Sequence, residues 1–277
     1  MHSCEKSNKT TNIVLAIRVL LLLALVFLEG YLILGCLPKV IAGAFALSGL
    51  ELDSHDLATK YSMGIAIRIL GIVSLLPFFK YLNVFPTFSC KINKNCFALS
   101  WIFFIYIVAN LEIENIAVAN PWLIVLMILE CLAIGFYEEL LFRGLLLSQF
   151  TELFGKRKSN IICAVLASSF VFGLFHLVNL RSGVGLETVL FQIGYTFIMG
   201  VAFSALLLRT NWNILWCSLV HAFYDIASGF GDFSVVQSVE GSTLKAQSMT
   251  IYANIINLCL FLPLLLYALF LLRKVKE

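Results

Sequence analysis

Residues 13–36 read IVLAIRVLLLLALVFLEGYLILGC, an apolar run interrupted only by Arg18 and Glu29. A membrane-spanning helix needs about 20 predominantly apolar residues, so this run is long enough to cross a bilayer. The rest of the chain has the same character, since 61% of the 277 residues are hydrophobic and 13% are charged. Soluble domains carry roughly 25% charged residues. The composition therefore predicts an integral membrane protein and excludes a water-soluble globule.

Seven further stretches have the length and apolar character of membrane spans, or nearly so. The eight predicted spans are residues 13–36, 61–82, 96–110, 121–145, 160–180, 187–208, 212–230 and 250–272. We therefore expect an all-α, polytopic membrane protein of about eight transmembrane helices. No internal repeat and no linker marks a second domain, so residues 1–277 are predicted to form one membrane domain.

The distribution of Lys and Arg predicts how this domain is oriented, because cytoplasmic connections carry an excess of both residues. If the N-terminus is cytoplasmic, the inner segments hold Lys6, Lys9, Lys80, Lys91, Lys94, Lys156, Arg157, Lys158, Arg209, Arg273, Lys274 and Lys276. The outer segments hold only Lys39, Lys60, Arg181 and Lys245. Arg18, Arg68 and Arg143 fall within spans. The bias predicts that both termini are cytoplasmic, and a bacterial plasma membrane is the expected location.

Net charge and cysteine spacing indicate which kinds of partner and site to expect. The net charge of +3 is small and gives no indication of a nucleic-acid partner, so the lipid bilayer is the expected surrounding. The eight cysteines are scattered without a Cys-x-x-Cys pair. This pattern is typical of small apolar residues that pack between helices, and it indicates neither a disulfide framework nor a thiolate metal site.

Tyr137-Glu138-Glu139-Leu140-Leu141-Phe142-Arg143 places three charged residues late in the fourth span. Charged side chains in a membrane are costly and usually functional. Glu139 and Arg143 are four residues apart and can pair along the helix. Glu138 then points about 100° away from that pair, free for another task such as general base catalysis. The alternative is that both glutamates are solvated at the helix end.

Two other spans carry histidines in the patterns Phe172-x-x-x-His176 and His221-x-x-x-Asp225. Residues four apart share one face of a helix, so each pair projects in one direction. A carboxylate beside a histidine can fix its tautomer. Structural alternatives remain open, since a lone histidine is often simply packed, and a buried His–Asp pair can be purely structural.

Taken together, these motifs place ionisable residues on three different spans and predict a polar cavity inside the membrane. One function of such a cavity is peptide hydrolysis. Another is a proton or ion relay through Glu138, His176, His221 and Asp225 in a transporter. Many transporters contain paired half-repeats, and this sequence has none that we detect.

The ordered set Glu-Glu-x-x-x-Arg, Phe-x-x-x-His and His-x-x-x-Asp resembles the CAAX protease and bacteriocin-processing (CPBP) family. That family includes type II CAAX prenyl endopeptidases and bacterial Abi proteins. The resemblance runs from about Trp122 to Phe230. It implies that helices in 121–230 form the catalytic core, that residues 1–120 contribute helices without motifs, and that 250–272 is a C-terminal span.

The resemblance also implies an activity, namely an intramembrane endopeptidase of the glutamate type. Its substrate would be a membrane-associated peptide or lipidated protein, for example a bacteriocin leader or a prenylated C-terminus. A non-catalytic bacteriocin-immunity protein that keeps the same fold is a further alternative.

The resemblance implies a role for each motif residue. Glu138 would activate water and His176 would help to bind it. His221 and Asp225 would stabilise the oxyanion or position the substrate carbonyl. The supporting residues that hold the shape of the site would be Glu139, Arg143 and Phe172.

Asp225 departs from the prenyl endopeptidases, which usually have Asn at this position. An ionised Asp cannot donate a hydrogen bond to an oxyanion, so we expect Asp225 to orient His221, which would be the donor.

No metal is expected, because the sequence lacks the compact His-Glu-x-x-His zinc motif. The alternative is a Zn²⁺ site, for which the candidate ligands are Glu138, His176, His221 and Asp225.

The positions of Glu138 and His176 along their predicted spans are difficult to reconcile with one shared site. Glu138 lies near the inner end of its predicted span, whereas His176 lies about 25 Å above the start of its own. The two can meet only if the fourth and fifth helices extend past the bilayer on the cytoplasmic side. Residues 149–158 are compatible with such an extension.

Overall fold

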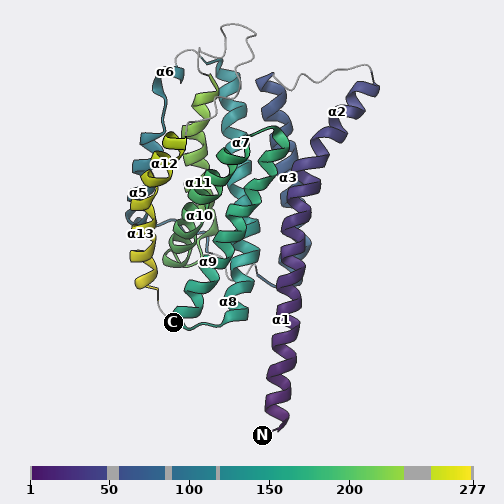
Figure 1. Cartoon of the computed structure of the whole chain (residues 1–277), viewed down its shortest axis with the longest axis vertical. Coiled ribbons are helices and arrows are strands. Elements are labelled where there is room, and N and C mark those ends of the chain that lie inside the picture. Colours follow the sequence, from purple (N-terminus) through teal and green to yellow (C-terminus); the bar gives the residue numbers. More distant parts are fainter. Residues whose placement is uncertain (1, 49–55, 85–88, 117–118, 234–250, 276–277) are drawn as a thin grey trace.

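The computed structural model describes the chain except for residues 1, 49–55, 85–88, 117–118, 234–250 and 276–277, and the described part is helical without strands (Figure 1). The N-terminal helices are α1 (His2–Leu28), η1 (Glu29–Cys36), α2 (Leu37–Leu47), α3 (Leu57–Tyr81), α4 (Lys94–Leu99), α5 (Trp101–Ala109) and α6 (Ile113–Ile116). The central helices are α7 (Pro121–Glu139), η3 (Leu140–Leu147), α8 (Ser148–Phe154), α9 (Lys158–Phe175) and η4 (His176–Ser182). The C-terminal helices are α10 (Leu186–Arg209), α11 (Ile214–Gly229), η5 (Phe230–Phe233), α12 (Ile251–Leu260) and α13 (Leu262–Arg273).

Five helical stretches in the described part are long and apolar enough to cross a membrane, which confirms an integral membrane protein. They are Ile13–Leu47, Leu57–Tyr81, Lys158–Arg181, Leu186–Arg209 and Ile251–Arg273. They correspond to five of the eight predicted spans. The first is longer than predicted, because the helix continues through η1 and α2 without a break.

The other three predicted spans do not meet this criterion and stay predictions. Residues 96–110 are divided into α4 and α5 at Ser100, whose hydroxyl donates a hydrogen bond back to the carbonyl oxygen of Cys96. Such side-chain bonds compete with regular helix geometry. In the predicted span 212–230, α11 has 16 residues, fewer than the 19 predicted. Residues 121–145 belong to a longer helix that continues through η3 and α8 to Phe154.

This longer helix resolves the difficulty over depth. Glu138 lies 17 residues after Pro121 and 16 residues before Phe154, so it is near the middle of the helix rather than near its end. At 1.5 Å per residue, each arm is about 25 Å long. The extension on the side of residues 149–158 is therefore present, and Glu138 and His176 can lie at similar depth.

The helix α7 is central in the bundle and packs between α3 and α11. A Cβ atom at Gly135 would lie 2.8 Å from the carbonyl oxygen of Ser218 and 2.9 Å from the amide nitrogen of Ala222. No side chain fits there, so the backbones of α7 and α11 touch one turn from Glu138 and His221. This close contact sets the spacing of the two helices that carry most of the polar motifs.

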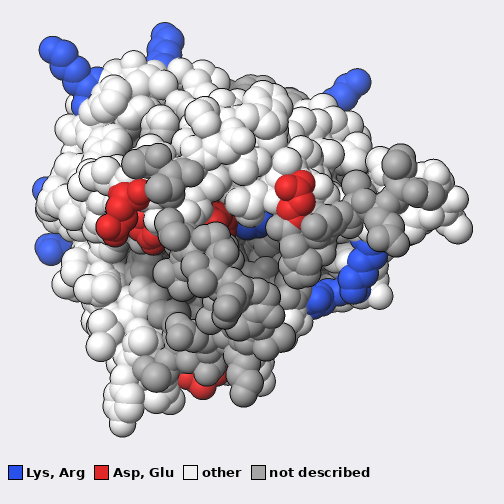
Figure 2. Space-filling view, turned by 90° about the horizontal axis from the view of Figure 1, so that it is seen from above, with Lys and Arg blue, Asp and Glu red and all other residues white. Residues whose placement is uncertain are grey.

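The bundle has two distinct ends. The helix α1 begins and the helix α13 ends on the same side, at the bottom of Figure 1. We refer to this side as the lower end and to the opposite side, which carries α6 and the start of α7, as the upper end. Seen from above, acidic side chains lie in several separate places on the upper end, whereas most basic side chains project around the outline (Figure 2).

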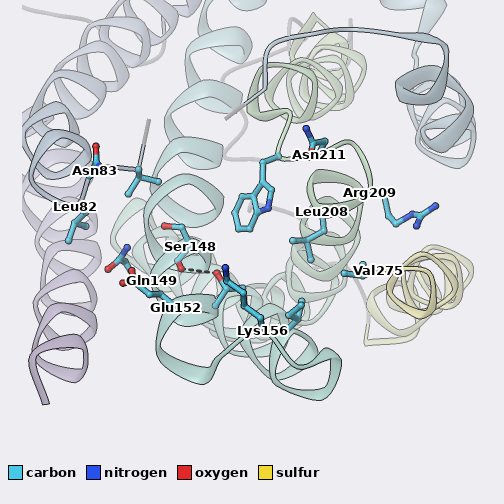
Figure 3. A pocket seen from close by; sticks show the side chains of 14 residues that line it. Leu82, Asn83, Ser148, Gln149, Glu152, Lys156, Leu208, Arg209, Asn211 and Val275 are labelled. Atoms are coloured by element: carbon cyan, nitrogen blue, oxygen red, sulfur yellow. Dashed lines mark hydrogen bonds between the residues drawn. The ribbon is translucent and has the colours of Figure 1, made fainter. Parts of the chain in front are cut away.

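Two separate cavities occupy these two ends. The upper cavity has a volume of about 510 Å³ and is lined by residues of α3, α7, α10 and α11, among others. The lower cavity has a volume of about 680 Å³ and is lined by residues such as Gln149, Lys156 and Arg209 (Figure 3). No residue lines both cavities.

Candidate active site

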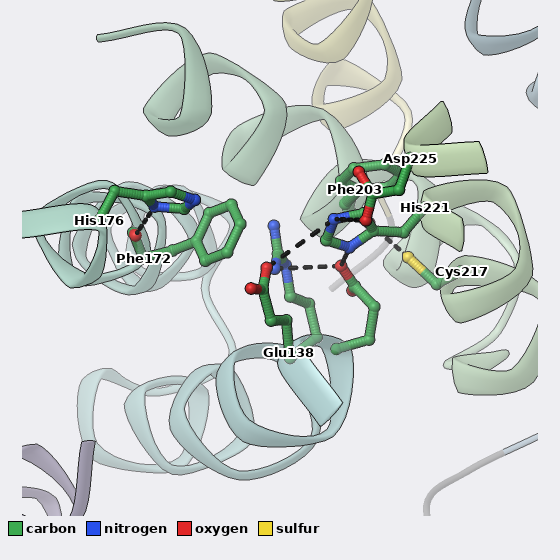
Figure 4. Close-up of polar contacts among 9 residues, drawn as sticks. Glu138, Phe172, His176, Phe203, Cys217, His221 and Asp225 are labelled. Atoms are coloured by element: carbon green, nitrogen blue, oxygen red, sulfur yellow. Dashed lines mark hydrogen bonds and ion pairs between the residues drawn. The ribbon is translucent and has the colours of Figure 1, made fainter. Parts of the chain in front are cut away.

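The predicted catalytic residues come from three helices and line the upper cavity. Glu138, His176, His221 and Asp225 all line it, although His221 is 83 residues from Glu138 in the sequence. In Figure 4, Glu138 lies between His176 on one side and His221 with Asp225 on the other. The structure therefore places the three sequence motifs around one space.

Glu139 is the buried anchor of this arrangement. Its side chain is fully buried, and its Oε1 atom lies 3.1 Å from Nη1 of Arg143, whose residue is 1% exposed. The same oxygen accepts a hydrogen bond at 2.9 Å from Nδ1 of His221. The pairing of Glu139 with Arg143 that the spacing predicts is confirmed. The bond to His221 was not predicted, because it joins residues 82 positions apart.

Aromatic rings close around the ion pair. The guanidinium of Arg143 lies 4.3 Å from the centre of the Phe172 ring and 5.6 Å from that of Phe203. Phe203 also stacks on His221, with ring centres 4.9 Å apart. An arginine over an aromatic face is attracted to it, most strongly where water is excluded. Phe172 thus has a contact that supports the shape of the site.

His221 has a defined orientation because of its bond to Glu139. A carboxylate only accepts hydrogen bonds, so Nδ1 carries the proton that it donates to Glu139. The other ring nitrogen, Nε2, lies 3.6 Å from Oδ2 of Asp225 and 3.8 Å from Oε2 of Glu138. These distances exceed those of hydrogen bonds. Glu139, rather than Asp225, is therefore the closest group that orients His221, and Nε2 faces the cavity.

Glu138 keeps its carboxylate available. The residue is 8% exposed, and in the described part of the chain its side chain accepts no hydrogen bond. Its nearest charged neighbour is the Nε2 atom of His221 at 3.8 Å. A carboxylate that faces a polar cavity without a fixed donor can bind a water molecule or accept a proton.

His176 presents one ring nitrogen to the cavity from the opposite wall. Its Nδ1 atom lies 3.0 Å from the carbonyl oxygen of Phe172, which can only accept, so Nδ1 is the donor. In the neutral imidazole Nε2 is then an acceptor. The ring packs edge-on against Phe172, with centres 5.1 Å apart. A water molecule between Glu138 and His176 would find an acceptor on each side.

Two further charged residues belong to the surroundings of this site, and the motifs did not identify them. Glu29 is 3% exposed and accepts hydrogen bonds from the hydroxyls of Ser74, at 2.5 Å, and Tyr137, at 3.0 Å. It thereby ties η1 and α3 to the residue before Glu138. Arg68 lines the cavity from α3. The only signal for either in the sequence was a single charge inside an apolar span.

The residues do not fit a zinc site in this arrangement. Among the described residues, no group of three or more His, Cys, Asp or Glu side chains is placed to hold a metal ion. His176 lies across the cavity from His221, with Glu138 between them.

Comparison with known proteins agrees with the motifs. Residues 120–227, somewhat less than half of the chain, match the family described as type II CAAX prenyl endopeptidase Rce1-like. No curated protein and no solved structure matches the chain. The matched segment runs from Asn120, which caps α7, to Ala227 in α11, and it contains every residue of the site from Glu138 to Asp225. The resemblance is thus confirmed over residues 120–227, which match the type II CAAX prenyl endopeptidase Rce1-like family.

Proposed function

We propose that this protein is an intramembrane endopeptidase that hydrolyses a peptide bond of a membrane-associated substrate with a water molecule activated by Glu138. The observation that carries the proposal is the position of Glu138, whose carboxylate accepts no hydrogen bond among the described residues and lies between two histidines in the upper cavity. The family match supports a CAAX-type intramembrane protease and hence a hydrolase. The glutamate mechanism, the substrate and the eight-span topology are our proposals.

In the proposed reaction, Glu138 takes a proton from the water molecule that it holds with His176. The oxygen of that water forms a bond to the carbon of the peptide carbonyl, and the carbonyl oxygen becomes an oxyanion. Glu138 then passes the proton to the peptide nitrogen, and the C–N bond breaks. The products are a carboxyl group and an amine, so one water molecule has been added across the bond.

His221 would stabilise the oxyanion in this scheme. When both of its nitrogens are protonated, it donates from Nδ1 to Glu139 and from Nε2 to the cavity. Donors held in place before the reaction stabilise developing charge, and losing one typically costs about 10²–10³-fold in rate. Glu139, Arg143 and Phe172 position this donor.

The sequence does not support the transporter alternative, since many transporters contain paired half-repeats and none is detected in this chain. Below Glu138, the side chains of Leu141, Phe142, Leu145 and Leu146 are at most 1% exposed. A bacteriocin-immunity role that is independent of catalysis would survive Glu138→Ala, and endopeptidase activity would not.

Reconstitution in liposomes tests the proposal directly. We expect the purified protein to cleave one peptide bond in acylated or prenylated peptides, and to incorporate one ¹⁸O atom from labelled water into the new carboxyl group. His176→Ala should slow this reaction by at least about 100-fold, and a chelator should leave it unchanged. Mass spectrometry of the products is the measurement. Glu138-dependent proton uptake without cleavage would instead establish the transporter.

Asp225→Asn should have a small effect by comparison. Because Glu139 holds Nδ1 of His221 at 2.9 Å while Asp225 is 3.6 Å from Nε2, losing the charge of Asp225 should leave His221 oriented. We expect kcat/KM for a cleaved peptide to fall less than about 10-fold, or roughly 1.4 kcal/mol. A loss as large as that of His221→Ala would show that Asp225 has a role that Glu139 cannot fill.

A further inference from the structure

The first membrane-spanning stretch holds a buried acid that the proposed reaction does not use. Glu29 lies in Ile13–Leu47, is 3% exposed and precedes the matched segment 120–227. Its Oε2 atom accepts a hydrogen bond at 3.0 Å from the hydroxyl of Tyr137, and its Oε1 atom lies 2.5 Å from the hydroxyl of Ser74. A carboxylate is costly to bury in a membrane even when it is hydrogen-bonded, so its presence here indicates a role.

Tyr137 is the residue through which Glu29 reaches the active site. The tyrosine is fully buried, and it directly precedes Glu138 in the chain. A Cβ atom at Gly71 would lie 2.5 Å from Cε2 of Tyr137, so the tyrosine ring packs directly against the backbone of α3. The position of Tyr137 is thus fixed by α3 along its ring and by η1 at its hydroxyl.

This contact lies on the side of α7 opposite to the contact with α11. Tyr137 follows Gly135 by two residues, which corresponds to about 200° around a helix. The ring of Tyr137 packs on α3, whereas Gly135 packs on α11, so α7 is held from two nearly opposite sides. Glu138 points about 100° away from Tyr137. A rotation of α7 that turns Glu138 out of the upper cavity must therefore also displace Tyr137 from Glu29.

Irregular helix geometry makes such support necessary at this point. The part of the chain that the structure describes contains two π-helical segments, and they begin at Glu29 and directly after Glu139. Such wide turns are rare and often occur at functional sites. The regular α-helical bonding of α7 therefore ends one residue after Glu138, and the bond from Tyr137 to Glu29 joins the two irregular segments.

We propose that Glu29 is a positioning residue, which holds Glu138 in its catalytic orientation through the hydroxyl of Tyr137. Neither Glu29 nor Tyr137 is among the described lining residues of the upper cavity, so both act through Glu138. The inference rests on the endopeptidase function proposed above. It extends the active site to the first span of the chain, which lies outside the matched segment.

Tyr137→Phe tests this role, because it removes the hydroxyl and keeps the ring that packs on Gly71. A small misplacement of a catalytic group is costly, so we expect kcat for a cleaved peptide to fall at least about 10-fold, with KM within about twofold. Tyr267→Phe is the matched control. It removes a hydroxyl that donates to the carbonyl oxygen of Leu99, also at 3.0 Å, and Tyr267 does not line the upper cavity. Its kcat should stay within about twofold of the wild-type value.

Two substitutions of Glu29 separate the hydrogen bond from the charge. Glutamine can still accept from the hydroxyl of Tyr137 through its amide oxygen, whereas alanine cannot. Glu29→Gln should therefore keep kcat within about threefold of wild type, and Glu29→Ala should lose about as much as Tyr137→Phe. Combining Glu29→Ala with Tyr137→Phe should lower kcat no further, because both changes remove the same interaction. The thermal midpoint of each purified variant reports whether it is folded.

Unchanged kcat in Tyr137→Phe would overturn the positioning role, as would losses that multiply in the double variant. A raised KM with unchanged kcat would also overturn it, because the defect would then lie in binding. Equal losses in Glu29→Gln and Glu29→Ala would assign the effect to the charge and have the same force. If Glu29→Ala does not fold, Tyr137→Phe and Glu29→Gln still decide the question. A wild-type protein that cleaves no peptide would instead refute the endopeptidase function itself.

Discussion

Glu138→Gln is expected to slow peptide hydrolysis by at least about 100-fold, because glutamine cannot take a proton from water. The substitution keeps the size of the side chain, and Glu138 accepts no hydrogen bond among the described residues, so the fold should persist. The measurement is kcat for one cleaved peptide, together with the thermal midpoint of the purified protein. We expect kcat to fall and the midpoint to stay within a few degrees.

Glu130→Gln is the matched control for this variant. Glu130 lies on the same helix, two turns nearer the upper end, and lines the same cavity without a part in the proposed reaction. Its substitution should change kcat by less than about 10-fold, or roughly 1.4 kcal/mol of activation free energy. Near-wild-type activity in Glu138→Gln would remove the proposed mechanism. Equal losses in the two variants would point to the charge of the cavity rather than to proton transfer.

Arg143→Met should destabilise the protein more than any other single change considered. It leaves the carboxylate of Glu139 fully buried, with His221 as its remaining close partner. Removing one partner of a buried ion pair typically costs 3–5 kcal/mol, so we expect a loss of about 3 kcal/mol in the free energy of unfolding. Unfolding by denaturing detergent in mixed micelles measures this loss.

The double variant Glu139→Gln with Arg143→Met separates the cost of an unpaired charge from the cost of lost packing. It removes both charges at once, and replacing a whole buried pair by neutral groups is often close to neutral. We expect it to regain at least half of the stability lost in Arg143→Met. A double variant as unstable as the single one would mean that the stacking of Arg143 on Phe172 matters more than its charge.

The features of the fold and the site that depend on local residue spacing could be predicted from the sequence. The membrane class follows from composition, and the pairing of Glu139 with Arg143 follows from a separation of four residues on a helix. Five spans were found because long apolar runs have few alternatives to helix in a bilayer. The same reasoning could not locate the break at Ser100, whose hydroxyl donates to the carbonyl oxygen of Cys96 and accepts from Trp216, a residue 116 positions away.

Contacts between segments that are distant in the chain could not be predicted from the sequence. Nothing local indicates that Glu139 bonds to His221, or that Glu29 reaches Tyr137 across 108 positions. The length of the helix that carries Glu138 was also underestimated, because the predicted span ended at residue 145 while the helix continues to Phe154. Each of these features depends on how the helices are packed, which hydropathy along one chain does not encode.

The contact of α7 with α11 at Gly135 bears on how such a protein can change during evolution. Since backbone touches backbone there, the separation of the two helices does not depend on the size of any side chain. Substitutions at other lining residues of the upper cavity, for example Lys60, Ser228 or Asp232, can then reshape the cavity without displacing Glu138 from His221. A lineage could exchange one substrate for another by altering these residues alone, while the hydrolytic machinery is inherited unchanged.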